Sequence, residues 1–381
     1  MNTTIETEKS VKSVASIFAA MTDRRKPKGI RYQFQPLLIL LSLSKLCSQD
    51  TPSEIADWVA NRSSLLTEKL GLEWKRMPSL STWQRLIAET IEVSELDELV
   101  GQYFQTLSSN EQKLLNLDGK VACATIDEET NRQLHLLALQ ESQSNAVVEQ
   151  TALSAGENEI SAAKRLLAKA ELKNKIVSGD AIFAQTELSQ KVVEKGGQYV
   201  WKLRANQGSI YEMAKNHFAE MDDKYQARAS SLDKGHGRIE EREILTSFRL
   251  AHKIEFPYLA QVFRIVRKSE EVKTGKRSEQ MIYGITSLPV EEFSAKELLA
   301  LTRQHWSVEN GLHYRRDVTF KEDKVRQTSQ RGGRVLAVLN NLTIGILRKL
   351  GWENIAKARR HFSAMIDEAL NLILLPIKLL L

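Results

Sequence analysis

The stretch KLLNLDGKVACAT, residues 113–125, begins the series of segments that decides the fold of this chain. Two more apolar, strand-like segments follow it, RQLHLLALQ (132–140) and NAVVEQTAL (145–153), and polar turns separate all three. Apolar residues then recur at helical spacing in EISAAKRLLAKAEL (159–172). Short apolar runs bounded by turns are typical of strands, so the pattern predicts three strands followed by a helix.

The next segments extend this sheet. KNKIVSGDAIF (173–183) is predicted to be a fourth strand, TELSQKVVEKGG (186–197) a helix closed by glycines, and QYVWKLRA (198–205) a fifth strand. The order strand, strand, strand, helix, strand, helix, strand is that of a ribonuclease H-like domain. In such a domain an antiparallel trio of strands is extended by parallel strands through helical crossovers.

The prediction divides the chain into four parts. Residues 1–110 have a helical pattern, and residues 111–204 together with 291–350 are expected to form the ribonuclease H-like α/β domain. Residues 205–290 interrupt that domain with further strand-like segments and polar turns, which predicts a β-rich insertion. Residues 351–381 are predicted to be a C-terminal helical tail.

Composition excludes several classes of protein. The 381 residues include 54 Lys and Arg against 48 Asp and Glu, a net charge of +6 that favours a polyanionic partner. Two cysteines are too few for a disulfide framework or a cysteine zinc site, so we expect a reducing, cytoplasmic location. The apolar stretches 37–46 and 369–381 are shorter than the ~20 residues that span a bilayer, which predicts buried helices and no membrane partner. The second stretch is also a candidate docking or dimerisation helix.

Basic residues gather in two segments. The segment VRQTSQRGGR, residues 325–334, contains three arginines. The other segment, RRKPKGIR, contains Arg24, Arg25, Lys26, Lys28 and Arg31. Such clusters suit contacts with the phosphates of double-stranded DNA, although a run of charge carries no sequence specificity and also fits an ordinary solvated surface.

A helix-turn-helix-like reader of DNA is predicted within residues 1–110. Residues 51–54 (TPSE) have the signature of a capping box that opens one helix. The segment PSLSTWQRLIAET (78–90) predicts a second helix, with its apolar residues on one face and Gln84 and Arg85 facing outward. We therefore expect this domain to bind DNA, although a plain helical bundle has the same pattern.

Three carboxylates are predicted to meet at one point. Asp118 ends the first strand and Asp180 ends the fourth, and these strands are neighbours in the predicted topology. Glu309 comes from a long helix that begins near residue 294 and is expected to cross that edge of the sheet. Hard oxygen ligands suit Mg²⁺ or Mn²⁺, and a pair of such ions ~4 Å apart serves phosphoryl transfer.

Several spaced motifs contain these acids. Asp118 lies in a DGK motif, Asp180 in a GDA motif, and Glu309 in the pattern R-x-H-W-x-x-E-N-x-L-H from Arg303 to His313. The other motifs are Gly196-Gly197-Gln198-Tyr199-Val200, Arg204-Ala205-Asn206-Gln207, His236-Gly237-Arg238-Ile239-Glu240-Glu241-Arg242 and DV-x-F-x-E-D from Asp317 to Asp323. With them the chain resembles, across nearly its whole length, the DDE transposases of bacterial insertion sequences, specifically the H-repeat-associated, ISAs-type group. Two departures are Arg204, where the family has lysine, and VACATIDEE, where it has a T-x-RGS-like stretch.

The resemblance implies a cut-and-transfer mechanism on double-stranded DNA. Asp118, Asp180 and Glu309 would be the catalytic residues and would hold two Mg²⁺ (or Mn²⁺) ions per active site. Water would attack the phosphodiester at the end of the element, and the freed 3′-OH would then attack target DNA. A homodimer on DNA is expected, because the two terminal inverted repeats are brought together.

Basic residues in or near these motifs are expected to contact DNA. They are Lys120, Arg238, Arg242, His305, His313 and Arg316. The last three lie four residues before, four after and seven after Glu309, hence on its face of a continuous helix. We assign His305 and Arg316 to phosphates at or beside the scissile bond.

Two other functions stay open from the residues alone. His305, Glu309 and His313 have the spacing of a zinc site, which would make the chain a metallohydrolase unrelated to DNA. The departure at VACATIDEE is consistent with a catalytically weakened or domesticated DNA-binding protein derived from a transposase. Metal-dependent nicking of DNA distinguishes the three.

The insertion contains aromatic candidates for handling an extruded base. Phe248, Tyr258 and Phe263 are those candidates, because base extrusion needs an aromatic or apolar partner. Each is more often a core residue, and Trp201 in the fifth strand is predicted to be core.

Overall fold

One mixed sheet runs through the molecule in the computed structural model, which describes residues 12–107, 113–126, 131–220, 227–235, 237–308, 312, 314–324 and 329–377. The first five strands are β1 (Lys113–Ile126), β2 (Gln133–Glu141), β3 (Val147–Ala152), β4 (Lys175–Gly179) and β5 (Gln198–Leu203). They lie in the order β3-β2-β1-β4-β5, with β2 antiparallel to both β1 and β3, and with β4 and β5 parallel to β1. The five strands predicted from the sequence, and their directions, are confirmed.

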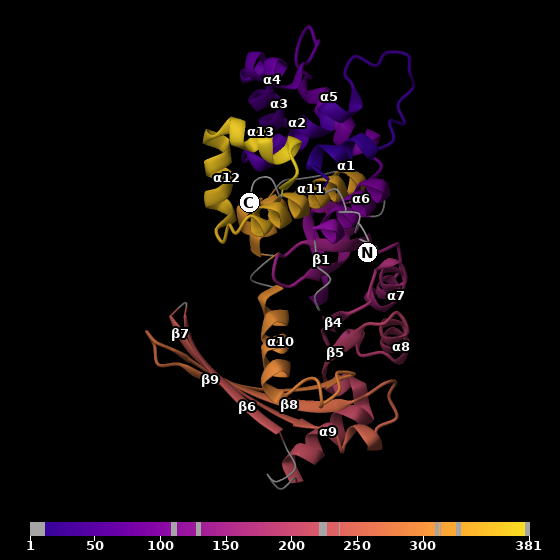
Figure 1. The fold of residues 1–381 in the computed structure, drawn as a ribbon, viewed down its shortest axis with the longest axis vertical. Helices are drawn as coiled ribbons and strands as arrows, with labels where there is room; N and C mark the ends of the chain where they lie inside the picture. Colours follow the sequence, from indigo (N-terminus) through magenta and orange to yellow (C-terminus); the bar gives the residue numbers. More distant parts are fainter. Residues whose placement is uncertain are drawn as a thin grey trace, which may run out of the picture.

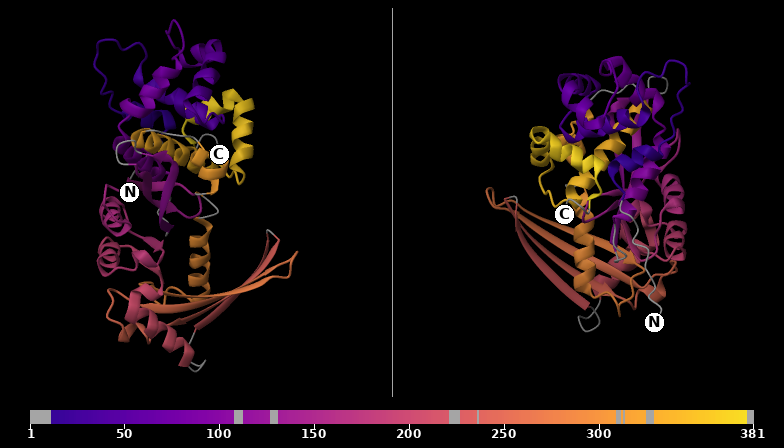
Figure 2. Two further views of the ribbon diagram at one scale, coloured as in Figure 1. Left: turned by 180° about the vertical axis from the view of Figure 1, so that it is seen from behind. Right: turned by 45° about the horizontal axis from the view of Figure 1, so that its top comes forward.

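Helical crossovers make the parallel pairing possible. α7 (Glu159–Lys169) connects β3 to β4, and α8 (Thr186–Glu194) connects β4 to β5. Asn158 caps α7 by accepting a hydrogen bond from the Ser161 N–H at 2.9 Å, and the apolar face of the helix is buried against the sheet. Both helices lie on one side of the sheet, and α10 (Ala295–Val308) lies on the other (Figures 1 and 2).

The inserted strands continue the same sheet. They are β6 (Ala227–Gly235), β7 (Arg238–Ser247), β8 (Gln261–Glu271) and β9 (Arg277–Thr286). β9 pairs antiparallel with β5, and the order then runs β8, β7, β6 to the edge. These strands form a curved extension that projects from the rest of the molecule, with α9 (Gly208–Glu220) at its base (Figures 1 and 2). The insertion therefore does not form a sheet of its own.

Helices from both ends of the chain pack together at the opposite pole. They are α1 (Val14–Ala20), α2 (Phe34–Leu46), α3 (Pro52–Asn61), α4 (Ser63–Leu70), α5 (Leu80–Arg85), the π-helical turn η1 (Leu86–Thr90), α6 (Val93–Thr106), α11 (Gln330–Lys349), α12 (Ile355–Ala364) and α13 (Ile366–Leu374). The predicted capping box at Thr51 is present. The apolar stretch 37–46 is buried in α2. In the second stretch, Ala369, Leu370, Leu372 and Ile373 are buried where α13 packs on α1 and α2 (Figure 1). No helix in the described ranges is long and apolar enough to cross a membrane.

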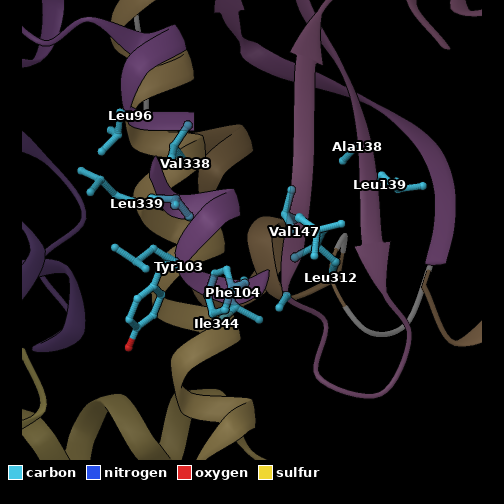
Figure 3. Packing of buried hydrophobic residues seen from close by; sticks show 14 of the residues in the cluster. Leu96, Tyr103, Phe104, Ala138, Leu139, Val147, Leu312, Val338, Leu339 and Ile344 are labelled. Carbon is cyan, nitrogen blue, oxygen red and sulfur yellow. The ribbon is translucent and has the colours of Figure 1, made fainter. Parts of the chain in front are cut away.

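α11 joins these helices to the sheet. Its Val338, Leu339 and Ile344 pack against α6 beside strands β2 and β3 (Figure 3). The two helices approach closely because Gly345 lies where a Cβ would be 2.4 Å from the Phe104 ring. One hydrophobic core therefore extends from the terminal helices into the sheet.

A buried cluster of charges links the terminal helices to the segment after α10. Asp50 Oδ1 accepts hydrogen bonds from Lys45 Nζ at 2.8 Å and from Arg359 Nη2 at 2.7 Å. Arg359 also donates to the Thr319 carbonyl at 3.1 Å and lies over the Phe320 ring, 4.0 Å from its centroid. The carboxylate thus offsets two buried cations, and the ring faces the remaining positive charge.

We predict that Asp50→Ala strongly destabilises the fold. The change leaves Lys45 and Arg359 buried without their carboxylate, and breaking a buried ion pair costs about 3–5 kcal/mol. The free energy of unfolding, measured by urea denaturation, should fall by that amount. Asp367→Ala removes an exposed pair with Lys69 and should cause no measurable change. Equal stability of Asp50→Ala and the unaltered protein would contradict the prediction.

Candidate active site

Asp118 and Asp180 lie side by side on two parallel strands. Only Asp180 lies at a strand end, because pairing with β2 carries β1 past Asp118 to Ile126, so the prediction that Asp118 ends the first strand is wrong. Leu117 of β1 is paired in register with Gly179 of β4, and each aspartate is the next residue along its strand. Neighbouring strands are ~4.8 Å apart, and residues level with each other point to the same face. Asp118 Oδ1 accepts a hydrogen bond from the Gly119 N–H at 2.9 Å. The prediction that these two carboxylates share one edge of the sheet agrees with this register.

Two cations and a histidine ring surround the Asp180 carboxylate. Lys202 Nζ donates to Oδ1 at 2.7 Å, His305 Nε2 lies 3.6 Å from the same oxygen, and an Arg204 Nη2 lies 3.6 Å from Oδ2. The contact with His305 and the charge of Lys202 hold the pKa of Asp180 well below its usual range, although partial burial acts in the opposite direction. Asp180 is therefore ionised at neutral pH.

Gly179 is needed for the close packing behind Asp180. A Cβ at this position would lie 2.8 Å from the Trp201 ring and 2.9 Å from the Phe183 ring. Both rings are buried, so neither has room to move aside. The glycine of the GDA motif is thus explained by packing, and the prediction that Trp201 is a core residue is confirmed.

α10 brings the third motif to the two aspartates. Its last turn contains His305, which is buried against Ser178 and Asp180. Glu309 and His313 lie outside the described residues, so the third carboxylate stays a prediction. Within the described ranges, no group of three or more His, Cys, Asp or Glu is placed to hold a metal ion. The zinc alternative needs the same two residues, and both ring nitrogens of His305 face Ser178 and Asp180.

The DV-x-F-x-E-D motif folds back onto β1. It forms the π-helical turn η7 (Arg315–Thr319) and the short helix η8 (Glu322–Lys324). Asp317 accepts from Lys120, two residues beyond Asp118, and Asp323 accepts from the backbone N–H of Cys123 at 3.1 Å. The motif therefore fixes this segment beside the site.

The assignment of Arg316 to a DNA phosphate is wrong for this conformation. Its side chain is 1% exposed, and the guanidinium forms a bidentate ion pair with Glu322. Arg316 lies in the π-helical turn η7, where its side chain is in the interior of the protein. Lys120 is also buried, against Asp317, so both cations hold η7 and η8 in place.

Arg242 is likewise not placed to contact DNA. It is buried in ion pairs with Asp233, at 2.8 Å, and with Glu240. Asp233 also accepts from Arg303 of α10 at 2.7 Å. Two family motifs are thus joined by an ion-pair network that fixes the inserted strands on α10, whereas Arg238 is exposed.

The basic N-terminal segment divides into exposed and engaged residues. Lys26, Lys28 and Arg31 are exposed. Arg24 is exposed as well, and its guanidinium lies 3.7 Å from the Glu92 carboxylate and 3.8 Å from that of Glu95. Arg25 instead forms a bidentate pair with Asp23 and lies over the Phe34 ring. Arg25 therefore holds the segment, and the other four remain candidates for phosphate contacts.

The structure agrees with only part of the helix-turn-helix prediction. Gln84 and Arg85 are exposed, and the apolar face of α5 and η1 is buried. The two helices of the hypothesis are not consecutive, however, because α4 lies between them. In the second basic segment, Arg331 bonds to the Ile91 carbonyl and Arg334 pairs with Asp97, so both are engaged within the chain.

The aromatic candidates in the insertion also divide. Phe248 is 44% and Tyr258 54% exposed, which leaves both available. Phe263 is 1% exposed and packs against α10. It is a core residue, so the prediction that it contacts an extruded base is wrong.

Three polar residues of the site were not singled out from the sequence. Lys202 contacts Asp180, while Ser178 and Asn116 bond to each other behind it at 2.7 Å. The available signal was strand alternation, which places Asn116 with Asp118, and Ser178 with Asp180, on one face.

Two family models and several relatives match this chain. The family model described as "Transposase DDE domain" matches residues 124–344, more than half of the chain, and one described as "DDE_Tnp_1-associated" matches residues 15–104. The chain is 22% identical over 348 residues to "Putative transposase YncI" of Escherichia coli O157:H7, covering 89% of this chain and 88% of the relative. It is also 22% identical over 347 residues to "H repeat-associated putative transposase YhhI" of Escherichia coli (strain K12), covering 88% and 90%.

Proposed function

Because the chain belongs to the family of transposases with a DDE domain, we propose that it cleaves the ends of an insertion sequence and joins them to target DNA. The observation that carries this proposal is the placement of Asp118 and Asp180 on one face of two neighbouring parallel strands, beside the last turn of α10. The strand order β3-β2-β1-β4-β5 supports a ribonuclease H-like domain.

The donor set fits a divalent metal ion with hard-ligand preference. Asp180 is ionised, Asp118 lies level with it, and Glu309 follows α10 by one residue, so these three carboxylates would hold two Mg²⁺ or Mn²⁺ ions. Bound ions of this kind activate an attacking oxygen and stabilise the leaving oxygen of a phosphodiester.

Cationic side chains next to Asp180 would stabilise the negative charge of the scissile phosphate. Lys202 and Arg204 reach Asp180 from β5 and the residue after it, so they flank the position of a scissile phosphate held at the carboxylates. Fixed positive groups at such a position stabilise the charge that develops in the transition state. Joining two ends of one element requires two active sites, so we propose a homodimer on double-stranded DNA.

The catalytic proposal is tested by amide substitutions at the carboxylates. Asp118→Asn, Asp180→Asn and Glu309→Gln should each abolish strand cleavage and joining in Mg²⁺ or Mn²⁺, because an amide keeps the size of the side chain and removes its charge. Folding and DNA binding should be retained. The assay uses purified protein with the DNA that flanks its own gene, followed by mapping of the cleaved ends.

Asp323→Asn is the control, because this exposed residue contacts the Cys123 N–H and not Asp180. It should keep most of the cleavage activity. Full cleavage by Glu309→Gln would remove Glu309 from the site and reopen the choice with Asp317 and Asp323. Specific DNA binding by the unaltered protein with no cleavage would favour the alternative of a catalytically weakened, transposase-derived DNA-binding protein.

The N-terminal DNA interface makes a separate prediction. Replacing Arg24, Lys26, Lys28 and Arg31 with Ala should weaken binding to all DNA sequences and flatten the salt dependence, because each phosphate contact releases about one counterion. Fluorescence anisotropy at several salt concentrations measures that slope. An unchanged slope would exclude these residues from the interface.

The same assay separates reading of bases from binding of phosphates. Changing the exposed Gln84 or Arg85 to Ala should lower the preference for element ends over random DNA, because base-edge contacts carry discrimination. An equal loss of affinity for both kinds of DNA would show that α5 and η1 do not read sequence.

A further inference from the structure

A chain of buried polar side chains leads to Asp180 from within the molecule. Ser178 Oγ lies 2.7 Å from Asn116 Oδ1 and 2.9 Å from His305 Nδ1. The other ring nitrogen of His305, Nε2, lies 3.6 Å from Asp180 Oδ1. Asn116, Ser178 and His305 are 1%, 2% and 9% exposed, so bulk water does not compete for these contacts. Asn116 lies on β1, Ser178 on β4 and His305 on α10, three elements that meet in this region (Figure 1).

The available protons decide which atom donates and which accepts in each of these hydrogen bonds. The Ser178 hydroxyl has one proton, which goes either to Asn116 or to His305. If it goes to Asn116, Ser178 accepts from His305 Nδ1–H, and a neutral imidazole then turns its bare Nε2 toward the Asp180 carboxylate. Two acceptors would face each other. An imidazolium would donate from both nitrogens and avoid that contact, but in either case Asn116 Nδ2 is buried with no partner among the described residues.

The opposite direction removes both difficulties. The oxygen and nitrogen of an amide have nearly the same shape, so Asn116 fits equally well with Nδ2 toward Ser178. Asn116 then donates to Ser178, Ser178 donates to His305 Nδ1, and His305 holds its proton on Nε2, which faces Asp180. The amide oxygen takes the place left by Nδ2, and a buried carbonyl without a partner is tolerated better than a buried N–H.

We propose that Asn116 and Ser178 are positioning residues that fix the tautomer of His305, so that its Nε2–H holds one oxygen of the Asp180 carboxylate. Lys202 donates to that same oxygen, Oδ1, at 2.7 Å. Oδ2 has a more distant cation, Arg204 at 3.6 Å. The relay and Lys202 therefore orient the carboxylate with Oδ2 toward the reacting groups. The tautomer is a property of the protein alone, and only the consequence for cleavage rests on the proposed function.

Nitrogen NMR of the full-length, metal-free protein with ¹⁵N-labelled histidine rings tests the tautomer, with His305→Gln assigning the signal. The unaltered protein should carry the proton on Nε2 at neutral pH. Asn116→Asp should move a proton to Nδ1, because Ser178 then donates to the new carboxylate and accepts from the ring. A proton on Nδ1 in the unaltered protein, or an unchanged signal in Asn116→Asp, would overturn the proposal.

Asn341→Asp is the matched control, because it also buries a carboxylate. Asn341 lies on α11 and donates to Gln150 of β3, away from His305, so the His305 signal should not change. If Asn116→Asp does not fold, Ser178→Ala and Ser178→Thr replace it. Ser178→Ala should give a mixture of tautomers, and Ser178→Thr should keep Nε2–H, since a small cavity beside Ser178 accommodates the added methyl group.

Cleavage measures the functional consequence. Ser178→Ala should lower kcat about 10- to 100-fold with unchanged affinity for DNA, the usual loss when the support of a metal-ligating group is removed, and Ser178→Thr should restore it. A normal tautomer and normal kcat in Ser178→Ala would overturn the relay. If the unaltered protein does not cleave DNA, the proposed function fails, whereas the NMR result still decides the tautomer.

Discussion

Parallel pairing of β1 with β4 is the constraint on which the site depends. The register that places Leu117 beside Gly179 also places Asp118 beside Asp180, and a shift of one residue would turn one carboxylate to the opposite face of the sheet. Parallel strands cannot be joined by a short turn, so α7 is needed to bring β4 back alongside β1. The close packing of Gly179 on Trp201 further restricts how β4 can lie.

Buried charge connects the terminal helices to that sheet edge. Asp50 holds Lys45 and Arg359 together, and Arg359 also bonds to the Thr319 carbonyl at the end of η7. The same turn contains Asp317, which contacts Lys120 on β1. Helices from the two ends of the chain therefore support a segment next to Asp118 and Asp180.

Several charged residues of the family motifs have structural roles. Arg316 is neutralised by Glu322, and Arg242 by Asp233 and Glu240. A buried guanidinium needs carboxylate partners, because leaving its charge unpaired away from water is costly. Arginine in such a motif therefore does not by itself indicate a phosphate contact. Exposed cations such as Lys28 and Arg238 are better candidates, because they can reach DNA without breaking a buried ion pair.

The sequence by itself determined the strands and helices of residues 113–203 and the presence of the two aspartates on neighbouring strands, because apolar periodicity and turn residues are local signals. It did not determine that β1 continues past Asp118. It did not determine that the inserted strands continue the sheet through β9 and β5, since pairing between distant strands leaves no mark on either one. Only the tertiary structure decided which cations are buried. Arg316 and Arg25 look like surface arginines in the sequence, yet each is paired with a carboxylate. The partners of a side chain are set by the packing of whole elements, which the spacing of residues along one helix cannot show.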